Sequence, residues 1–251
     1  MSTKSKWTGQ NLTFFDDKYN TSVLAGPWAD APVLPALIDP SIAHTVFEDF
    51  NDIDAATLAG WTATQATAGT WAIADATGGE ALADSGSTTQ HQGINVQKLG
   101  ECFTPAANKD IWFECRFKVV DTYDKAQIFV GLAETDTTLM PSGDLDSTNT
   151  EYVGFGIETT GAGALKIYGC KATAEDSDAA ATIAEATYIK VAFKITGLTK
   201  VEHWINDVKG STTLVTANIP TNALTPSFVC QTDGTNDPIL HVDYVRCMQL
   251  R

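Results

Sequence analysis

The feature that most constrains this fold is a recurring alternation of apolar and polar residues in short segments. The clearest case is Ile111–Val119, in which apolar residues alternate with Glu114, Arg116 and Lys118. Successive side chains of a strand point to opposite faces, so this segment predicts a strand with one buried face and these three charged residues directed outward. Tyr188–Ile195 repeats the arrangement. The pattern predicts an all-β fold built from antiparallel strands.

Other segments extend this pattern. Gln127–Leu132 and Tyr152–Ile157 are more continuously apolar or glycine-rich, which is typical of strands covered on both faces. Val201–Ile205, followed by an Asn-Asp dipeptide, predicts one arm of a hairpin and its turn. Leu240–Arg246 predicts the last strand. We find no long helical pattern, and 251 residues suffice for one large β domain.

Three polar stretches predict long loops: Ala74–Gln92, Thr135–Thr150 and Thr173–Ala186. Long loops on a rigid β scaffold are where binding residues tend to lie. Asp52–Leu58 predicts a single helical turn with an aspartate cap.

Residues 1–45 differ from the rest and predict an extended, proline-rich N-terminal arm ahead of a domain over residues 46–251. Prolines at positions 27, 32, 35 and 40 fix φ and remove amide donors, so neither a helix nor a central strand is expected there. Aromatic residues argue against plain disorder. They are the candidate partner contacts of the arm: Trp7, Phe14, Phe15, Tyr19 and Trp28. Packing on its own domain and reaching a neighbouring subunit both stay open for this arm.

Charge limits the classes of partner. The chain has 31 acidic and 16 basic side chains and a formal net charge of −15. Binding to phosphate backbones and anionic lipids depends on Lys and Arg, so neither nucleic acid nor membrane is an expected partner. The positively charged start lacks the apolar stretch of a signal peptide, and no apolar run is long enough to cross a bilayer.

The five cysteines are scattered and show no spacing typical of a zinc site. This distribution favours a reduced compartment. Cys115 and Cys247 lie within predicted strands, where a free cysteine behaves as a small buried apolar residue.

From residue 47 onward the order of signals resembles the concanavalin-like, laminin-G-like jelly-roll superfamily. Three stretches carry the resemblance: Phe47–Phe50 with Trp61 as the opening strand, Tyr188–Ile195 leading into Val201–Asp207 as paired strands, and Leu240–Arg246 as the closing strand. It covers about four fifths of the chain. The resemblance implies an antiparallel β-sandwich, a jelly roll, over the domain.

The superfamily includes laminarinase-type hydrolases, in which one strand presents Glu-x-Asp-x-x-Glu so that a nucleophile and an acid face the glycosidic bond together. The comparable segment here is Tyr152–Glu158, which keeps only Glu158. No Gly-x-Ser-x-Gly elbow accompanies the four scattered histidines, and no phosphate loop or dinucleotide fingerprint is present. We therefore expect no catalysis and no cofactor.

Ligand binding leaves two further candidates. Asp144, Asp146, Asn149 and Glu151 share one predicted loop, but their spacing differs from that of a known calcium loop, so no metal is expected. Trp112 is the most interesting aromatic, because alternation places it on the outward face with Glu114 and Arg116. These three form a candidate ligand or interface surface, which the arm or a second subunit would equally well cover.

The whole chain resembles virion structural proteins of tailed bacteriophages, and capsid cement or decoration proteins in particular. The resemblance implies a protein made in the host cytoplasm that binds the major capsid protein lattice on the outer face of the shell, as a dimer or trimer. Two alternatives stay open: a carbohydrate-binding, lectin-like module and a tail or fibre component.

Overall fold

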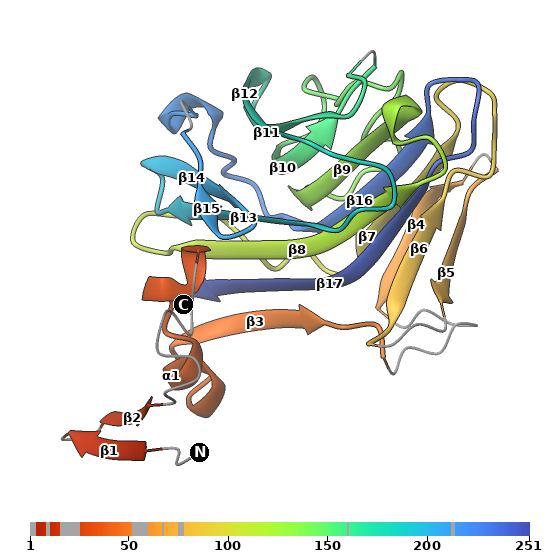
Figure 1. The fold of residues 1–251 in the computed structure, drawn as a ribbon. Coiled ribbons are helices and arrows are strands. Elements are labelled where there is room, and N and C mark those ends of the chain that lie inside the picture. The colour runs from red at the N-terminus through yellow and green to blue at the C-terminus, as the bar shows by residue number, and fades with distance from the viewer. Residues whose placement is uncertain are drawn as a thin grey trace.

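Two antiparallel sheets pack face to face (Figure 1). The computed structural model describes residues 4–8, 11–15, 26–51, 60–66, 68–74, 78–159, 161–211 and 214–251. The seven-stranded sheet has the order β12-β11-β10-β9-β16-β7-β4, and the eight-stranded sheet has the order β15-β14-β13-β8-β17-β6-β5, with β3 also paired to β17. Figure 1 shows β9, β10 and β11 in one layer and β8, β13 and β17 in the other. The predicted β-sandwich is confirmed.

The strands of the seven-stranded sheet are β4 (Trp61–Ala66), β7 (Gly93–Lys98), β9 (Ala126–Ala133), β10 (Tyr152–Ile157), β11 (Ala164–Lys171), β12 (Ala174–Thr182) and β16 (Thr225–Thr232). Those of the eight-stranded sheet are β3 (Ala43–Glu48), β5 (Thr70–Ala74), β6 (Glu80–Asp84), β8 (Ile111–Val120), β13 (Ile189–Thr196), β14 (Lys200–Ile205), β15 (Val208–Lys209) and β17 (Ile239–Leu250). Short 3-10 turns, η2 (Tyr123–Lys125) and η3 (Thr216–Asn218), lie in the connections.

Alternation along the strands builds the core between the sheets, as predicted. Phe113 and Phe193 stack with their ring centroids 4.8 Å apart, and Phe155 approaches Phe193 from the opposite sheet. Cys115 and Cys247 are buried in this core, which confirms their role as apolar filling. The inner faces thus account for most of the apolar residues that the sequence places at alternate positions.

The Asn206–Asp207 turn between β14 and β15 has φ values of 49° and 68°. Both values lie in the left-handed region that Asn and Asp tolerate and that a tight hairpin turn requires. The predicted hairpin is confirmed.

Two of the three predicted loops are wrong in part, because each contains a strand. β6 lies within Ala74–Gln92 and β12 within Thr173–Ala186. Ala, Asp and Ser have low strand propensity. Pairing of β6 with β5 and β17, and of β12 with β11, overrides this low propensity. The third stretch, Thr135–Thr150, is a loop as predicted. Asp52–Leu58 lies outside the described residues.

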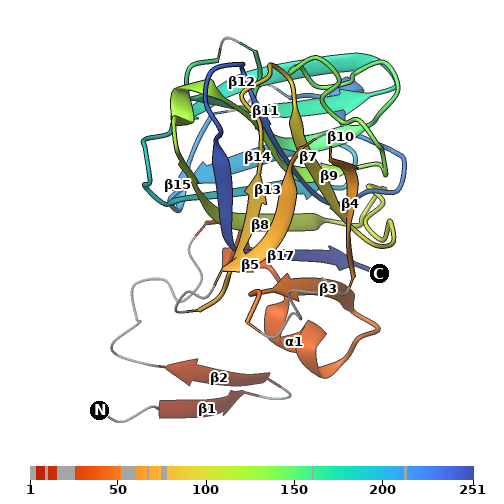
Figure 2. The same cartoon turned by 90° about the vertical axis from the view of Figure 1, so that its right-hand side faces the viewer.

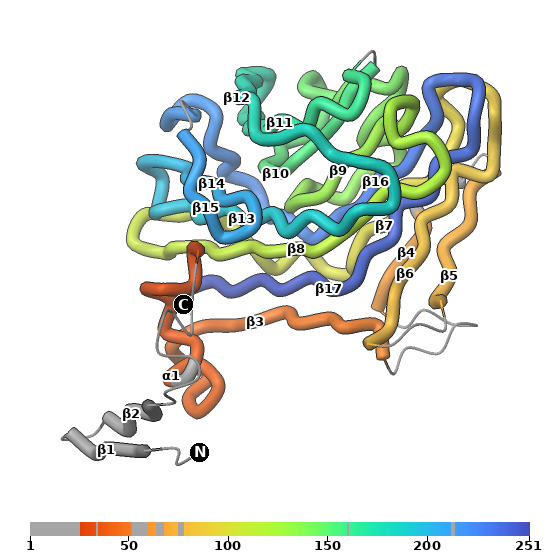
Figure 3. Tube along the Cα trace, in the orientation of Figure 1, coloured from red at the N-terminus to blue at the C-terminus, as the bar shows by residue number. Residues whose placement is uncertain are grey.

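β17 extends along the whole eight-stranded sheet (Figure 3). Its first residues pair with β6 and its last residues pair with β3, while β8 follows its other side. No described strand pairs with the second edge of β3.

The arm contains regular structure that the sequence did not predict. A 3-10 turn, η1 (Gly26–Asp30), and a short helix, α1 (Val33–Ile38), pack on the eight-stranded sheet, so the expectation of no helix is wrong. Pro32 takes the N-cap position and Pro35 lies in the first turn, where amide donors have no intrahelical partner to lose. Figure 2 shows α1 beside β3. Further upstream, β1 (Lys4–Thr8) and β2 (Asn11–Phe15) form a separate two-stranded sheet. Among the described helices, none has the length and apolarity to cross a membrane.

Candidate binding surface on the eight-stranded sheet

Trp112 and Glu114 lie on the outer face of β8, as alternation predicts, yet both are almost completely buried. Trp112 is 2% exposed and Glu114 is 1% exposed. Residues 26–42, which we call the N-terminal cover, lie over them. Trp28 and Ala36 of the cover pack with Trp112 and Met248 in a separate apolar cluster. The cover therefore removes most of the predicted ligand surface from solvent.

Glu114 links this cover to the sheet, because it accepts from Trp28 of the cover and from Tyr244 and Arg246 of β17. Its carboxylate accepts hydrogen bonds from Trp28 Nε1 at 2.9 Å and from the Tyr244 hydroxyl at 2.7 Å, and it pairs with Arg246 at 2.8 Å. The Arg246 guanidinium also lies over the Trp28 ring, 4.4 Å from its centroid. A buried carboxylate is stable when its lone pairs are satisfied in this way.

Asp30 fixes the cover a second time. It accepts a hydrogen bond from Trp112 Nε1 at 3.2 Å and pairs with Lys194 Nζ at 2.5 Å. Burial acts to raise the pKa of Asp30, but the hydrogen bonds from Lys194 and Trp112 lower it overall. Lys194 also pairs with Asp110 at 3.2 Å, and together these carboxylates raise the pKa of the lysine against the opposing effect of burial.

Arg116 lies beyond the cover and is bound within the sheet. It pairs with Asp243 at 2.6 Å and its guanidinium lies 3.9 Å from the centroid of the Tyr188 ring. Of the three residues predicted as one surface, Arg116 alone therefore reaches the solvent.

The five predicted arm contacts fall into three groups. Trp28 is 3% exposed and packs on its own domain, so in this structure its ring is not available to a partner. For Trp7, Phe14 and Phe15 the described part is the backbone of β1 and β2. Tyr19 lies outside the described residues.

An apolar surface remains open beside the cover, and sequence reasoning missed it. Leu37 of α1 is 68% exposed and Phe47 of β3 is 65% exposed. Between them lies a groove of about 220 Å³ lined by Trp28, Val33, Leu37, Thr45, Val46, Phe47, Arg246, Cys247 and Met248. We call Leu37, Phe47 and this groove the β3 surface. The sequence signal for this surface was Phe47, which precedes Glu-Asp-Phe in a predicted strand.

The outer face of the seven-stranded sheet is closed in a different way. Residues 134–151, which we call the loop cover, place Leu139, Met140 and Leu145 against Phe129 and Tyr152. Leu139 and Met140 are 0% exposed. Polar side chains of the sheet bind the backbone of the loop cover, because Gln97 Nε2 donates to the Glu134 carbonyl at 2.8 Å and Asn95 Nδ2 donates to the Asp136 carbonyl at 2.9 Å. These contacts bury the centre of this face.

Glu158 extends from the end of β10 toward the margin of this face. It accepts hydrogen bonds from the Leu145 amide at 3.1 Å and from the Tyr168 hydroxyl at 2.9 Å. β12 adds Glu175, which accepts a hydrogen bond from the Tyr152 hydroxyl. Burial raises the pKa of Glu175, and the charges of Glu158 and Asp144 add to the effect. The sequence analysis did not predict that Glu175 lies beside Tyr152, because the residues of β12 were predicted to form a loop.

The residues weighed as calcium ligands satisfy the backbone instead. Asp146 accepts hydrogen bonds from the amides of Thr148 and Asn149. Glu151 accepts from the amides of Thr221 and Asn222 at 2.6 and 2.9 Å. Within the part of the chain that the structure describes, no three His, Cys, Asp or Glu side chains converge as metal ligands would.

Comparisons with known proteins place the fold. No family model and no curated protein matches the sequence. Among solved structures, a protein of unknown function from Shewanella oneidensis is similar at a TM-score of 0.59 and 14% identity, with 84% of this chain and 87% of that chain covered. The basic winged bean lectin bound to Tn-antigen is similar at 0.55 and 10%, with 82% and 99% covered. A carbohydrate esterase of the Shiga toxin-encoding bacteriophage phi24B is similar at 0.52 and 17%, with 84% and 97% covered. At these identities the likeness confirms the lectin-like, concanavalin-like jelly roll.

Proposed function

We propose that this chain is a non-catalytic structural protein of a virion, of the capsid cement or decoration type. It binds the assembled major capsid protein on the outer surface of the shell, and it does so as a dimer or trimer. The observation that carries the proposal is the β3 surface, where an open apolar groove lies beside an unpaired strand edge among the described strands. Exposed apolar patches of this kind mark protein interfaces.

The N-terminal region supports the same function. β1 and β2 pair with each other alone among the described strands. A two-stranded hairpin is only marginally stable by itself in water, so it gains by pairing with or packing on another surface. In this proposal the hairpin orders on a neighbouring subunit of the shell, so it binds the assembled lattice and not the free subunits. Binding of this kind stabilises the lattice by mass action.

Co-sedimentation with purified viral shells that lack the protein tests the proposal. The intact chain is expected to sediment at a saturating ratio, and a Leu37→Asp, Phe47→Asp variant is expected to stay in the supernatant. Val208→Asp is the matched control, because Val208 is 70% exposed on β15, away from the β3 surface. Equal sedimentation of both variants would reject the role of the β3 surface, and no sedimentation of the intact chain would reject the cement function.

Carbohydrate binding is the second candidate, and one observation favours it. Phe47 is an exposed aromatic ring beside a small hollow lined by Glu114, Lys190, Tyr244 and Arg246. An exposed ring next to hydrogen-bonding groups is a common arrangement for holding a sugar. Retention of a glycan on an array by the intact chain, abolished by Phe47→Ser, would favour this function over the cement function.

A further inference from the structure

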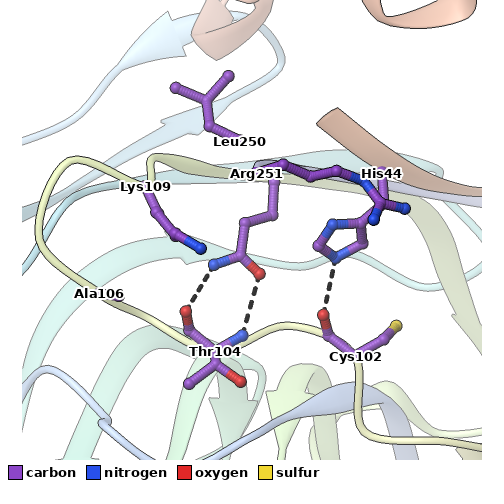
Figure 4. A pocket seen from close by; sticks show the side chains of 8 residues that line it. His44, Cys102, Thr104, Ala106, Lys109, Leu250 and Arg251 are labelled. Atoms are coloured by element: carbon purple, nitrogen blue, oxygen red, sulfur yellow. Dashed lines mark hydrogen bonds between the residues drawn. The ribbon is translucent and has the colours of Figure 1, made fainter. Parts of the chain in front are cut away.

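A second pocket lies where β3 begins and β17 ends, and no residue lines both this pocket and the β3 groove. Its volume is about 400 Å³, within the range of small-molecule sites. The lining side chains come from three places: His44 on β3, Cys102, Thr104 and Lys109 before β8, and Gln249 with Arg251 at the end of β17. Figure 4 shows Lys109 on one side and His44 with the Arg251 guanidinium on the other.

The charged side chains that line this pocket are opposite in sign to the net charge of the chain. The chain as a whole carries a net charge of −15, but the pocket is lined by Lys109, Arg251 and His44 and by no Asp or Glu. Within the described part of the chain, Lys98, Lys118, Lys190 and Lys194 all have carboxylate partners. Lys109 and Arg251 form no ion pair with any described residue. Two such cations facing one hollow create a field that attracts an anion.

Hydrogen bonds hold the floor of the pocket in place. The Thr104 amide donates to Gln249 Oε1 at 3.0 Å, and Gln249 Nε2 donates to the Thr104 carbonyl at 2.5 Å. Gln249 is 3% exposed, and it pairs with His44 across β17 and β3. The ring of His44 is fixed in turn, because its Nε2 donates to the Cys102 carbonyl at 2.7 Å and the ring lies against Phe103. A preformed floor lowers the ordering cost of binding a ligand.

We propose that this pocket binds a small molecule that carries an oxyanion group, either phosphate or carboxylate. The Arg251 guanidinium offers a planar fork that matches two oxygens of such a group, and the Lys109 ammonium adds a point charge from the other side. Burial lowers the pKa of His44, and the nearby charges of Arg251 and Lys109 lower it further, against the hydrogen bond to Cys102. His44 is therefore neutral at pH 7 and leaves Arg251 and Lys109 as the charges of the site. This proposal is independent of the virion function.

Calorimetric titration of the intact chain at low ionic strength tests the proposal. Inorganic phosphate and citrate represent the two sources of the oxyanion, and glucose is the neutral probe. Saturable binding of phosphate or citrate is expected, and it is expected to weaken as salt is added. A Lys109→Ala, Arg251→Ala variant is expected to bind at least about tenfold more weakly, because two charge-assisted contacts are lost.

Lys171→Ala is the matched control, since Lys171 at the end of β11 forms no ion pair among the described residues and lies outside the pocket. Its affinity is expected to equal that of the unchanged chain. Arg251→Lys keeps the charge but lacks the planar guanidinium, so its affinity is expected to lie between that of the double variant and that of the unchanged chain. Absence of saturable binding of both anions would overturn the proposal. Equal affinity in the double variant and in Lys171→Ala would also overturn it, and circular dichroism confirms that each variant is folded.

Discussion

The two outer faces of this sandwich are covered by opposite means. The seven-stranded sheet is closed by an internal loop, residues 134–151, that buries apolar side chains and ties its backbone to Gln97 and Asn95. The eight-stranded sheet is covered by a terminal segment, residues 26–42, that is fixed by Glu114 and Asp30. The first cover leaves little apolar area exposed, whereas the second leaves Leu37 and Phe47 in solvent.

This difference suggests that the two faces have different roles: one contributes to stability and the other offers a surface for a partner. On β10, Gly154 and Gly156 face outward under the loop cover, toward Phe129 and Tyr168. A sheet face that is closed in this way buries additional apolar side chains and so contributes to stability. The exposed apolar groove instead lies beside the N-terminal cover, and the binding that we propose uses this groove of the eight-stranded sheet.

Removing Glu114 has the largest expected effect on this comparison. Glu114→Ala leaves the Arg246 charge and the Trp28 and Tyr244 donors without their acceptor, which costs about 4 kcal/mol of stability. The free energy of unfolding in urea measures it, and faster proteolysis within residues 26–42 is expected. Glu202→Ala is the control, because Glu202 pairs with two exposed lysines and costs at most about 1 kcal/mol. Equal losses in both variants would show that the N-terminal cover does not depend on Glu114.

Two leucines compare the covers directly. Leu139→Ala empties a fully buried site in the loop cover and is expected to lower the free energy of unfolding by about 3 kcal/mol. Leu37→Ala removes the same atoms from a side chain that is 68% exposed and is expected to change stability by less than about 0.5 kcal/mol. Urea denaturation of both variants gives the two values. A large loss in Leu37→Ala would mean that Leu37 holds the N-terminal cover in place.

The sequence predicted the strands better than it predicted what covers them. Apolar and charged residues alternate strictly from Phe113 to Val119, because one face of β8 is core, so the strand and the side of each residue could be predicted. The sequence left open that the arm covers this surface, but it could not predict the burial of Glu114 by Trp28, since Trp28 lies 86 residues away in the chain. β12 was missed because its Ala, Asp and Ser residues suit a half-exposed edge strand with little apolar signal. Leu139, Met140 and Leu145, within an otherwise polar loop, were the one sign that residues 135–150 cover a face.

A pair of glycines on β10 tests how tightly the loop-covered face is packed. A Cβ on Gly154 would lie 2.7 Å from both the Gly131 Cα and the Phe129 Cζ, so Gly154→Ala must displace backbone of β9. On Gly156 the nearest atom would be the Ile128 carbonyl oxygen at 3.1 Å. We expect losses of about 2 kcal/mol and below about 1 kcal/mol respectively, measured by urea denaturation. Equal losses would show that this sheet face yields more readily than its packing indicates.

The smallest expected effect is the pH dependence of the N-terminal cover. Burial acts to raise the pKa of Asp30, but the hydrogen bonds that Asp30 accepts from Lys194 and Trp112 lower it below the ordinary value of 3.8. A lowered folded pKa means that stabilisation is present above the unfolded value and is lost as pH falls through the folded value. Because the Asp30 side chain is 63% exposed, solvent screening keeps the contribution below about 1 kcal/mol.

Asp30→Asn isolates this contribution. At neutral pH the variant is expected to unfold at a slightly lower urea concentration than the unchanged chain, and the difference is expected to vanish as pH falls below about 3.8. Asp243→Asn removes an ion pair, with Arg116, from the same sheet beyond the N-terminal cover. Tryptophan fluorescence separates the two variants, because Asp30 alone contacts Trp112. A total tryptophan emission that shifts equally in both variants would mean that Asp30 does not fix the cover, and that Glu114 holds it by itself.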